Sequence, residues 1–232
     1  MGPRSEASAA MASVKRSSAT AAAAARLECQ LTAHAHALAL AEVSGWPAAL
    51  GTVQVALNIT AADLGDAGFA QRFAASLKAH DLSAARFTLE LTEQAMLANP
   101  DNAVEQLTAL RAVGCRIAID DFGTGYSSLA LLAQLPIDYL KIDSGFTRAL
   151  GRSNRDQIVV RAIVELARAL ELSVIAEGVE TQEQRTMLAA LGVDTWQGFL
   201  GSGPVAGAEL AGIMNAKNRD SPHFLLFRFV TE

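Results

Sequence analysis

The sequence predicts an α/β fold, and three observations favour a closed (β/α) barrel within that class. From Gly51 onward, six short apolar segments alternate with longer amphipathic ones, an order typical of a parallel sheet with right-handed helical crossovers. Alternation alone fits an open doubly wound sheet as well as a barrel. Every predicted strand, however, carries a polar residue near its carboxyl end. A barrel gathers such residues from all its strands at one face, whereas an open sheet concentrates them at one switch point.

Length, composition and charge limit the classes of protein to which the chain can belong. The chain has 232 residues, 51% of them hydrophobic, which suffices for a sizeable core. The net charge of -5 offers no basic surface to a nucleic acid polymer. The two cysteines, Cys29 and Cys115, have no metal or redox spacing and suit a reducing cytoplasm. No apolar run reaches 18 residues, so we expect no membrane segment and a cytoplasmic location.

The chain divides into three parts. Residues 1–26 hold ten Ala and five Ser, and we expect a low-complexity, disordered leader there. Residues 27–215 form the expected barrel domain, beginning with a helix over Leu27–Trp46 on which His34 and His36 face different ways. Residues 216–232 form a C-terminal tail whose apolar segment, His223–Val230, resembles a strand.

Strands and helices follow in order along the barrel domain. The predicted strands are Val53–Asn58, Arg86–Leu91, Arg116–Asp120, Tyr139–Ile142, Ser173–Glu177 and Thr195–Phe199. The predicted helices are Gly68–Ala79, Ala103–Val113, Ser128–Gln134, Gln157–Leu170 and Glu183–Leu191. Thr181 and Gln184 have the spacing of a capping box, and Gly192 ends the last helix.

The polar residues at the strand ends predict a metal centre. An unpaired buried charge costs several kcal/mol, so the charges that four of the six strands carry must compensate one another or a metal ion. Amide and carboxylate ligands without His or Cys favour Mg²⁺ or Mn²⁺ over zinc. The residues concerned are Asn58, Glu90, Asp120 with Asp121, Lys141, Glu177 and Gln197.

The pair Asp120-Asp121 is the centre of this pattern. Neighbouring side chains in a strand point to opposite faces, but that limit relaxes where the chain bends into a loop. The glycines at 123 and 125 permit such a bend. We therefore expect both carboxylates to reach the same space beyond the strand end.

The residue types at this centre favour phosphoester hydrolysis. Two metal ions sharing a carboxylate can hold a phosphate, activate water and stabilise the leaving oxygen. Lys141 could stabilise charge on phosphorus or orient the nucleophile, and Glu177 could accept the proton of water. The sequence has no Gly-x-Ser-x-Gly elbow, Walker loop or Gly-x-Gly-x-x-Gly after a strand.

Six linked motifs, between residues 52 and 213, resemble those of the EAL-domain cyclic di-GMP phosphodiesterases. The segments are Leu57-Asn58-Ile59-Thr60, Glu90-Leu91-Thr92-Glu93, Asp120-Asp121-Phe122-Gly123-Thr124-Gly125-Tyr126-Ser127-Ser128, Lys141-Ile142-Asp143, Glu177-Gly178-Val179-Glu180-Thr181 and Gln197-Gly198. The resemblance implies a bacterial protein with a modified (β/α)8 TIM-like barrel. It also implies Mg²⁺- or Mn²⁺-dependent hydrolysis of cyclic di-GMP to linear pGpG.

The resemblance also implies roles for single residues. Asn58, Glu90, Asp120, Asp121 and Glu177 would be metal ligands. Lys141 would hold the catalytic water or the metal-site geometry, and Glu177 is also a candidate general base. Gln197, Glu93 and Glu180 would bind substrate or anchor the loop after Asp121, which would also form a homodimer surface.

The sequence departs from the family at its start. The Glu-Ala-Leu motif that supplies a metal-binding Glu, and the phosphate-gripping Arg after it, are not found; the nearest trace is Glu6-Ala7-Ser8. The barrel is therefore expected to be incomplete at its first two strands. His223–Val230 could fill that gap, pack outside the barrel or pair with a second subunit.

Three interpretations follow from this departure. The first is a phosphodiesterase weakened by loss of the EAL glutamate. The second is a catalytically inactive module that binds cyclic di-GMP or a protein partner in signalling. The third is a piece of a longer protein whose first strands lie upstream.

Overall fold

A single parallel sheet organises the structure. The computed structural model describes residues 27–51, 53–124, 129–151, 154–193, 195–205, 207, 209–210 and 226–228. In these residues, seven strands pair in the order β6-β5-β4-β3-β2-β1-β7. Their bounds are β1 (Gln54–Asn58), β2 (Phe87–Thr92), β3 (Arg116–Phe122), β4 (Tyr139–Ile142), β5 (Ser173–Ala176), β6 (Thr195–Trp196) and β7 (Leu226–Arg228).

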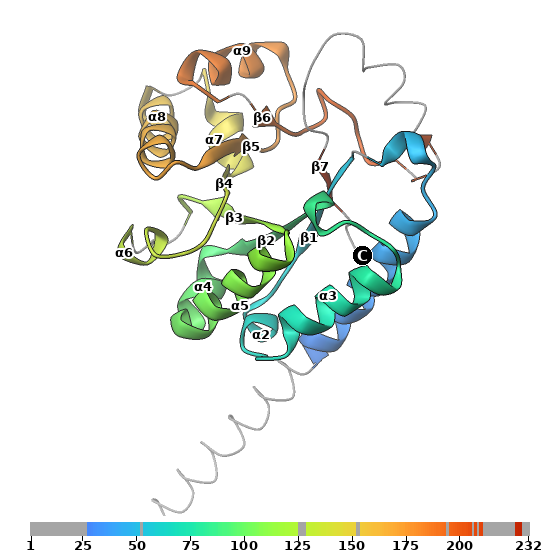
Figure 1. Ribbon diagram of the computed structural model, residues 1–232. Coiled ribbons are helices and arrows are strands. Elements are labelled where there is room, and N and C mark those ends of the chain that lie inside the picture. The colour runs from blue at the N-terminus through green and yellow to red at the C-terminus, as the bar shows by residue number, and fades with distance from the viewer. Residues whose placement is uncertain are drawn as a thin grey trace, which may run out of the picture.

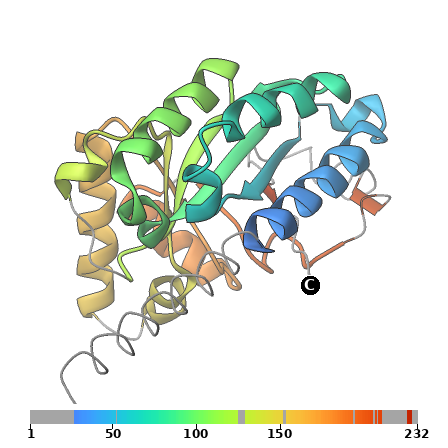
Figure 2. The same cartoon turned by 90° about the horizontal axis from the view of Figure 1, so that it is seen from below.

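The sheet curves into a half-barrel with helices along its outer side (Figures 1 and 2). Its two edges are β6 and β7, and no pairing between described residues joins them. This architecture confirms the predicted α/β barrel-like class, and in the described residues β1 is the first strand along the chain. Strand β7 pairs in parallel with β1, at the edge where the first two strands of a complete barrel were expected. Of the three placements expected for the C-terminal segment, the described residues Leu226–Arg228 show the first, since they add a strand beside β1 and fill part of the gap.

Helices connect the strands and cover the sheet. They are α2 (Ala61–Leu64), α3 (Phe69–Ala79), α4 (Glu93–Ala98), α5 (Pro100–Val113), α6 (Leu129–Leu132), α7 (Ser144–Ala149), α8 (Asn154–Ala169) and α9 (Gln182–Leu191), with short 3-10 helices η1 (Ala48–Leu50) and η2 (Ala84–Arg86). A further helix covers residues 27–44, beside α3 (Figure 1). The leader, residues 1–26, and most of the C-terminal tail lie outside the described residues.

The sequence did not predict three short helices, α2, α4 and α7. Each follows a strand directly and begins at a side-chain cap, supplied by Thr60, Thr92 and Asp143. Helices of four to six residues are too short to show an amphipathic period. The predicted capping box of Thr181 and Gln184 is confirmed at the start of α9.

One apolar core lies between the sheet and its helices. Alternate strand residues point into it, as Leu140 and Ile142 of β4 do, both with 0% of their surface exposed. Residues between them point to the inside of the half-barrel. Lys141 is one of these, and it too has no exposed surface. The fold thus collects the strands' polar residues on its inner face.

Candidate active site

Lys141 occupies the centre of a cluster of carboxylates. Its Nζ lies 2.7 Å from Oε1 of Glu90, 3.0 Å from Oδ1 of Asp120 and 2.6 Å from Oε1 of Glu177. These residues come from β2, β3, β4 and the first position after β5. The strand-end charges predicted from the sequence therefore do converge, and they compensate one another in part.

The ammonium of Lys141 stays charged in this buried place. Burial by itself would lower the pKa of Lys141, but the nearby charges of Glu90, Glu177 and Asp120 outweigh that effect and raise the pKa above its ordinary value. The protonated Lys141 forms ion pairs with three carboxylates, each with an oxygen within 3.0 Å of Nζ. The side chain is thereby fixed in one position.

Asp120 and Asp121 reach the same space because β3 is irregular there. The sequence predicted a strand ending at Asp120, but β3 continues to Phe122, and its register with β4 shifts between Ile119 and Phe122. Asp121 has a φ of 54°, unusual for a residue with a side chain. Its N–H donates to Oδ1 of Asp120 at 3.1 Å. The bulge therefore cancels the alternation that would have separated the carboxylates.

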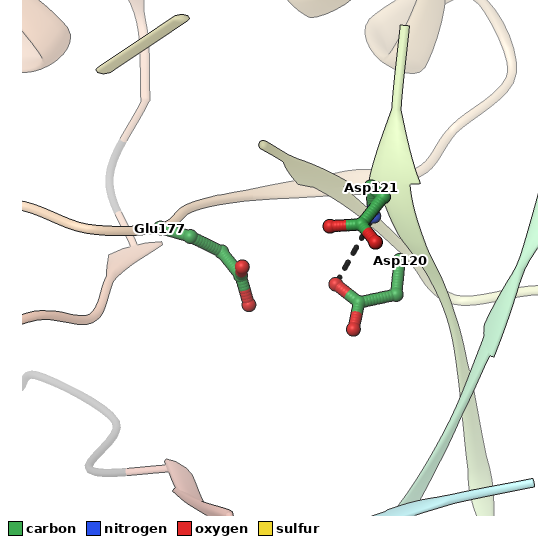
Figure 3. Close-up of side chains that lie close together, drawn as sticks. All are labelled: Asp120, Asp121 and Glu177. Carbon is green, nitrogen blue, oxygen red and sulfur yellow. Dashed lines mark hydrogen bonds between the residues drawn. The ribbon is translucent and has the colours of Figure 1, made fainter. Parts of the chain in front are cut away.

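Glu177 faces the aspartate pair from the opposite side (Figure 3). One oxygen of Glu177 and one from each aspartate lie within 4.8 Å of one another. Asp120 and Glu177 are buried, whereas Asp121 is exposed. The three carboxylates thus extend from the buried interior to the exposed surface of the half-barrel.

Gln197 holds Glu177 in place. Its Nε2 donates to Oε1 of Glu177 at 2.5 Å, the same oxygen that Lys141 contacts. The turn after β6 positions Gln197, because Val179 N–H donates to the Gln197 carbonyl at 3.0 Å. A Cβ on Gly198 would lie 2.3 Å from the backbone nitrogen and oxygen of Val179. Only glycine permits this approach.

Asn58 and Glu90 lie side by side at the ends of neighbouring strands. Their Cα atoms are partners in the parallel register of β1 and β2, so the side chains leave the same face of the sheet. Glu90 is buried and Asn58 is exposed. Asn58 thus extends the row of oxygen donors from the buried cluster toward the β1 side of the sheet.

The loop after Asp121 is tied to the end of β2. Oε1 of Glu93, a buried residue, accepts from the N–H of Gly123 at 3.0 Å. Residues 125–128, part of the predicted loop and dimer surface, lie outside the described residues. The backbone contact of Glu180 lies outside the carboxylate cluster. Its side chain is exposed, and its backbone N–H donates to Oε1 of Gln184 at 2.8 Å.

The donor set fits a hard divalent cation. Four carboxylates, those of Glu90, Asp120, Asp121 and Glu177, face the single charge of Lys141, which leaves three negative charges when all are ionised. Oxygen ligands of this kind suit Mg²⁺ or Mn²⁺. Asp120, Asp121 and Glu177 offer three such oxygens close together. A cation there would offset charge that Lys141 alone does not.

One residue near this site was not predicted to have a role. His36 is buried, and its Nε2 lies 2.8 Å from the backbone oxygen of Asn58. The sequence did predict that His34 and His36 face different ways, and His34 is indeed exposed. The alternation of exposed and buried faces along the helix indicates burial of His36 but does not reveal its partner, which is 22 residues away.

Comparison with known proteins gives the same picture. The family model "EAL domain" matches residues 10–204. A curated relative from Mycobacterium tuberculosis, an uncharacterised protein, is 41% identical over 178 residues. The match covers 76% of this chain but only 29% of that protein, so the chain spans less than a third of its relative's length.

Solved structures agree in fold. The phosphodiesterase MucR, solved in complex with cyclic di-GMP, is 38% identical with a TM-score of 0.73, over 79% of this chain and 80% of that one. BlrP1 of Klebsiella pneumoniae, solved with manganese and cyclic di-GMP, is 34% identical with a TM-score of 0.68, over 74% of this chain and 43% of that one.

Proposed function

The chain belongs to the EAL-domain family, and from this premise we propose that it is a metal-dependent phosphodiesterase that hydrolyses cyclic di-GMP to linear pGpG. The observation that carries the proposal is the cluster around Lys141, in which one buried ammonium meets three carboxylates from different strands. Similarity to MucR, a phosphodiesterase solved with cyclic di-GMP, supports the substrate. Similarity to BlrP1, solved with manganese, supports the cofactor.

We assign Mg²⁺ or Mn²⁺ to the oxygen-rich side of this cluster. Its ligands are drawn from Asn58, Glu90, Asp120, Asp121 and Glu177. When bound, such ions stabilise negative charge on the phosphate and make water a better nucleophile. The carboxylate excess described above is what the ions neutralise.

Glu177 is our candidate for the general base. As the oxygen of water bonds to phosphorus and the bond to the 3′ oxygen breaks, Glu177 accepts the proton released by water, and the 3′ oxygen takes up a proton from solvent to become the hydroxyl of pGpG. Lys141 and Gln197 both contact Oε1 of Glu177, at 2.6 and 2.5 Å, and thereby fix its orientation. Lys141 thus acts by holding the geometry of the carboxylates.

Other residues shape the surroundings of the site. Glu93 anchors the loop after Asp121 through the N–H of Gly123. Gln197 and Glu180 are assigned to substrate binding or loop anchoring on the family resemblance. The same loop is our candidate surface for a homodimer. We place the protein in the bacterial cytoplasm on the family resemblance. Separately, no helix in the described part of the chain is long and apolar enough to cross a membrane.

The second candidate function is that of a binding module without catalytic activity. The Glu-Ala-Leu motif and its following Arg are not found. Without that ligand and that phosphate contact, the half-barrel could bind cyclic di-GMP or a protein partner without hydrolysis. The two functions share the fold and differ in turnover.

An assay of product formation separates the two functions. Purified protein is incubated with cyclic di-GMP and Mn²⁺, and pGpG is followed by chromatography beside Lys141→Ala and Glu177→Ala. Product that disappears in both variants supports the enzyme. Binding of cyclic di-GMP by calorimetry without product supports the binding module. The absence of both would overturn the enzyme and the nucleotide-binding module, and would point to a scaffold that binds a protein partner or to a fragment.

A further inference from the structure

His36 is a buried polar residue that the proposed chemistry does not use. It lies on the helix over residues 27–44, far from the Lys141 cluster in sequence, yet its Nε2 contacts the carbonyl oxygen of Asn58 at 2.8 Å. A carbonyl oxygen only accepts, so Nε2 must carry the proton and donate. The bond joins the outer helix to the strand end that presents the Asn58 amide.

The bond meets β1 on its outer edge. The N–H of Ile59 donates to the Glu90 carbonyl of β2 at 2.8 Å. Because the backbone groups of successive strand residues point to opposite sides, the carbonyl of Asn58 points away from β2. The described part of β7 pairs on that side only with Gln54 to Ala56. His36 therefore holds the last carbonyl of β1 where the described β7 pairing does not reach.

The ring of His36 is itself held firmly. It packs against Phe69 and Phe73 of α3, with ring centroids 6.2 and 5.7 Å away. Its surface is only 7% exposed, so the phenylalanine rings leave it little room to move. A ring held in this aromatic pocket donates one fixed hydrogen bond.

Asn58 in turn lies beside Glu90 in the register of β1 and β2. Rotation of the last peptide of β1 would swing the Asn58 amide relative to Glu90, which Lys141 fixes. We propose that His36 is a positioning residue that sets the Asn58 amide for divalent-cation binding. The inference rests on the metal site of the proposed function. It does not require that the protein hydrolyses cyclic di-GMP.

The hydrogen bond is tested by two substitutions at position 36. His36→Leu keeps apolar contact with the phenylalanine rings and removes the donor, whereas His36→Gln keeps a donor at similar reach. Mn²⁺ affinity is measured by calorimetry without substrate. Loss of a residue that orients a ligand costs about 10- to 100-fold in affinity. We expect at least a tenfold weaker affinity for His36→Leu and substantial recovery in His36→Gln.

Two controls separate positioning from general loss of structure. Val43→Ala removes buried contacts from the same helix and should lower the melting temperature without changing Mn²⁺ affinity. In an Asn58→Ala background, His36→Leu should have no further effect, since its effect runs through Asn58. The inference would be overturned if His36→Leu left Mn²⁺ affinity unchanged or if the wild type did not bind Mn²⁺. It would also be overturned if His36→Leu lowered Mn²⁺ affinity as much in the Asn58→Ala background as in the wild type. A protein that binds Mn²⁺ normally but forms no pGpG would refute the enzyme alone.

Discussion

Nζ of Lys141 lies 2.6 Å from Oε1 of Glu177, and the lysine has no exposed surface. Lys141 lies in β4 and Glu177 directly follows the neighbouring strand β5, and the N–H of Glu177 donates to the Ile142 carbonyl at 3.1 Å. A buried ammonium is tolerated only because carboxylates surround it. The relationship makes Lys141 the residue on which the geometry of the cluster depends.

Removal of Lys141 should destabilise the protein strongly. Lys141→Ala leaves buried carboxylates uncompensated, and breaking a buried pair costs about 3–5 kcal/mol. Urea denaturation in a chelator measures the loss. Arg111→Ala is the matched control, because Arg111 pairs with Asp138 at the surface and such pairs contribute less than about 1 kcal/mol. Equal losses in the two variants would contradict the compensating role of Lys141.

Substitution of Glu177 should affect catalysis more than folding. Glu177→Gln keeps the size of the side chain and removes its basicity, so pGpG formation should fall by about 10²- to 10⁴-fold. Circular dichroism checks that the variant is folded. Glu165→Gln is the control, since Glu165 is exposed on α8 and has no role in the proposed site, so its side chain should matter little to turnover. Turnover within a few-fold of wild type in Glu177→Gln would rule out the proposed base.

Gly198 should tolerate no side chain. An added Cβ would lie 2.3 Å from backbone atoms of Val179, so Gly198→Ala must displace the turn that carries Gln197. We expect a loss of about 2 kcal/mol or more in unfolding free energy, together with weaker catalysis. In Gly203→Ala the nearest atom would be 3.6 Å away, an ordinary contact. A Gly198→Ala protein as stable as Gly203→Ala would show that the close approach is wrong.

Cys115 should be inert toward thiol reagents in the folded protein. Burial raises the pKa of Cys115 to about 12, whereas the thiol of an unfolded chain ionises near about 8.5. The contribution of this thiol to the free energy of unfolding is therefore fully present below about pH 8.5. It falls as the pH rises toward 12, because the unfolded chain then loses a proton that the folded protein keeps. At pH 8, Ellman's reagent should titrate only Cys29 in native protein and both thiols in denaturant. Rapid reaction of native Cys29→Ala would contradict the burial.

The sequence predicted the sheet and the convergence of its strand-end polar residues for a definable reason. Parallel strands end at one edge, so polar residues at strand ends, such as Glu90 and Lys141, must gather there. Periodicity could not show the bulge at Asp121, because the β3 irregularity depends on pairing with β4. Nor could it show the bond of His36 to Asn58, which forms between elements that only the fold brings together.

The most direct test of the account is a Mn²⁺ titration of the metal-free protein by calorimetry, without substrate. Carboxylates that converge on a cation predict saturable binding that Asp120→Asn and Asp121→Asn each weaken by at least tenfold, and that raises the melting temperature of the wild type. A wild-type protein that shows no saturable binding, or aspartate variants that bind as well as wild type, would contradict it.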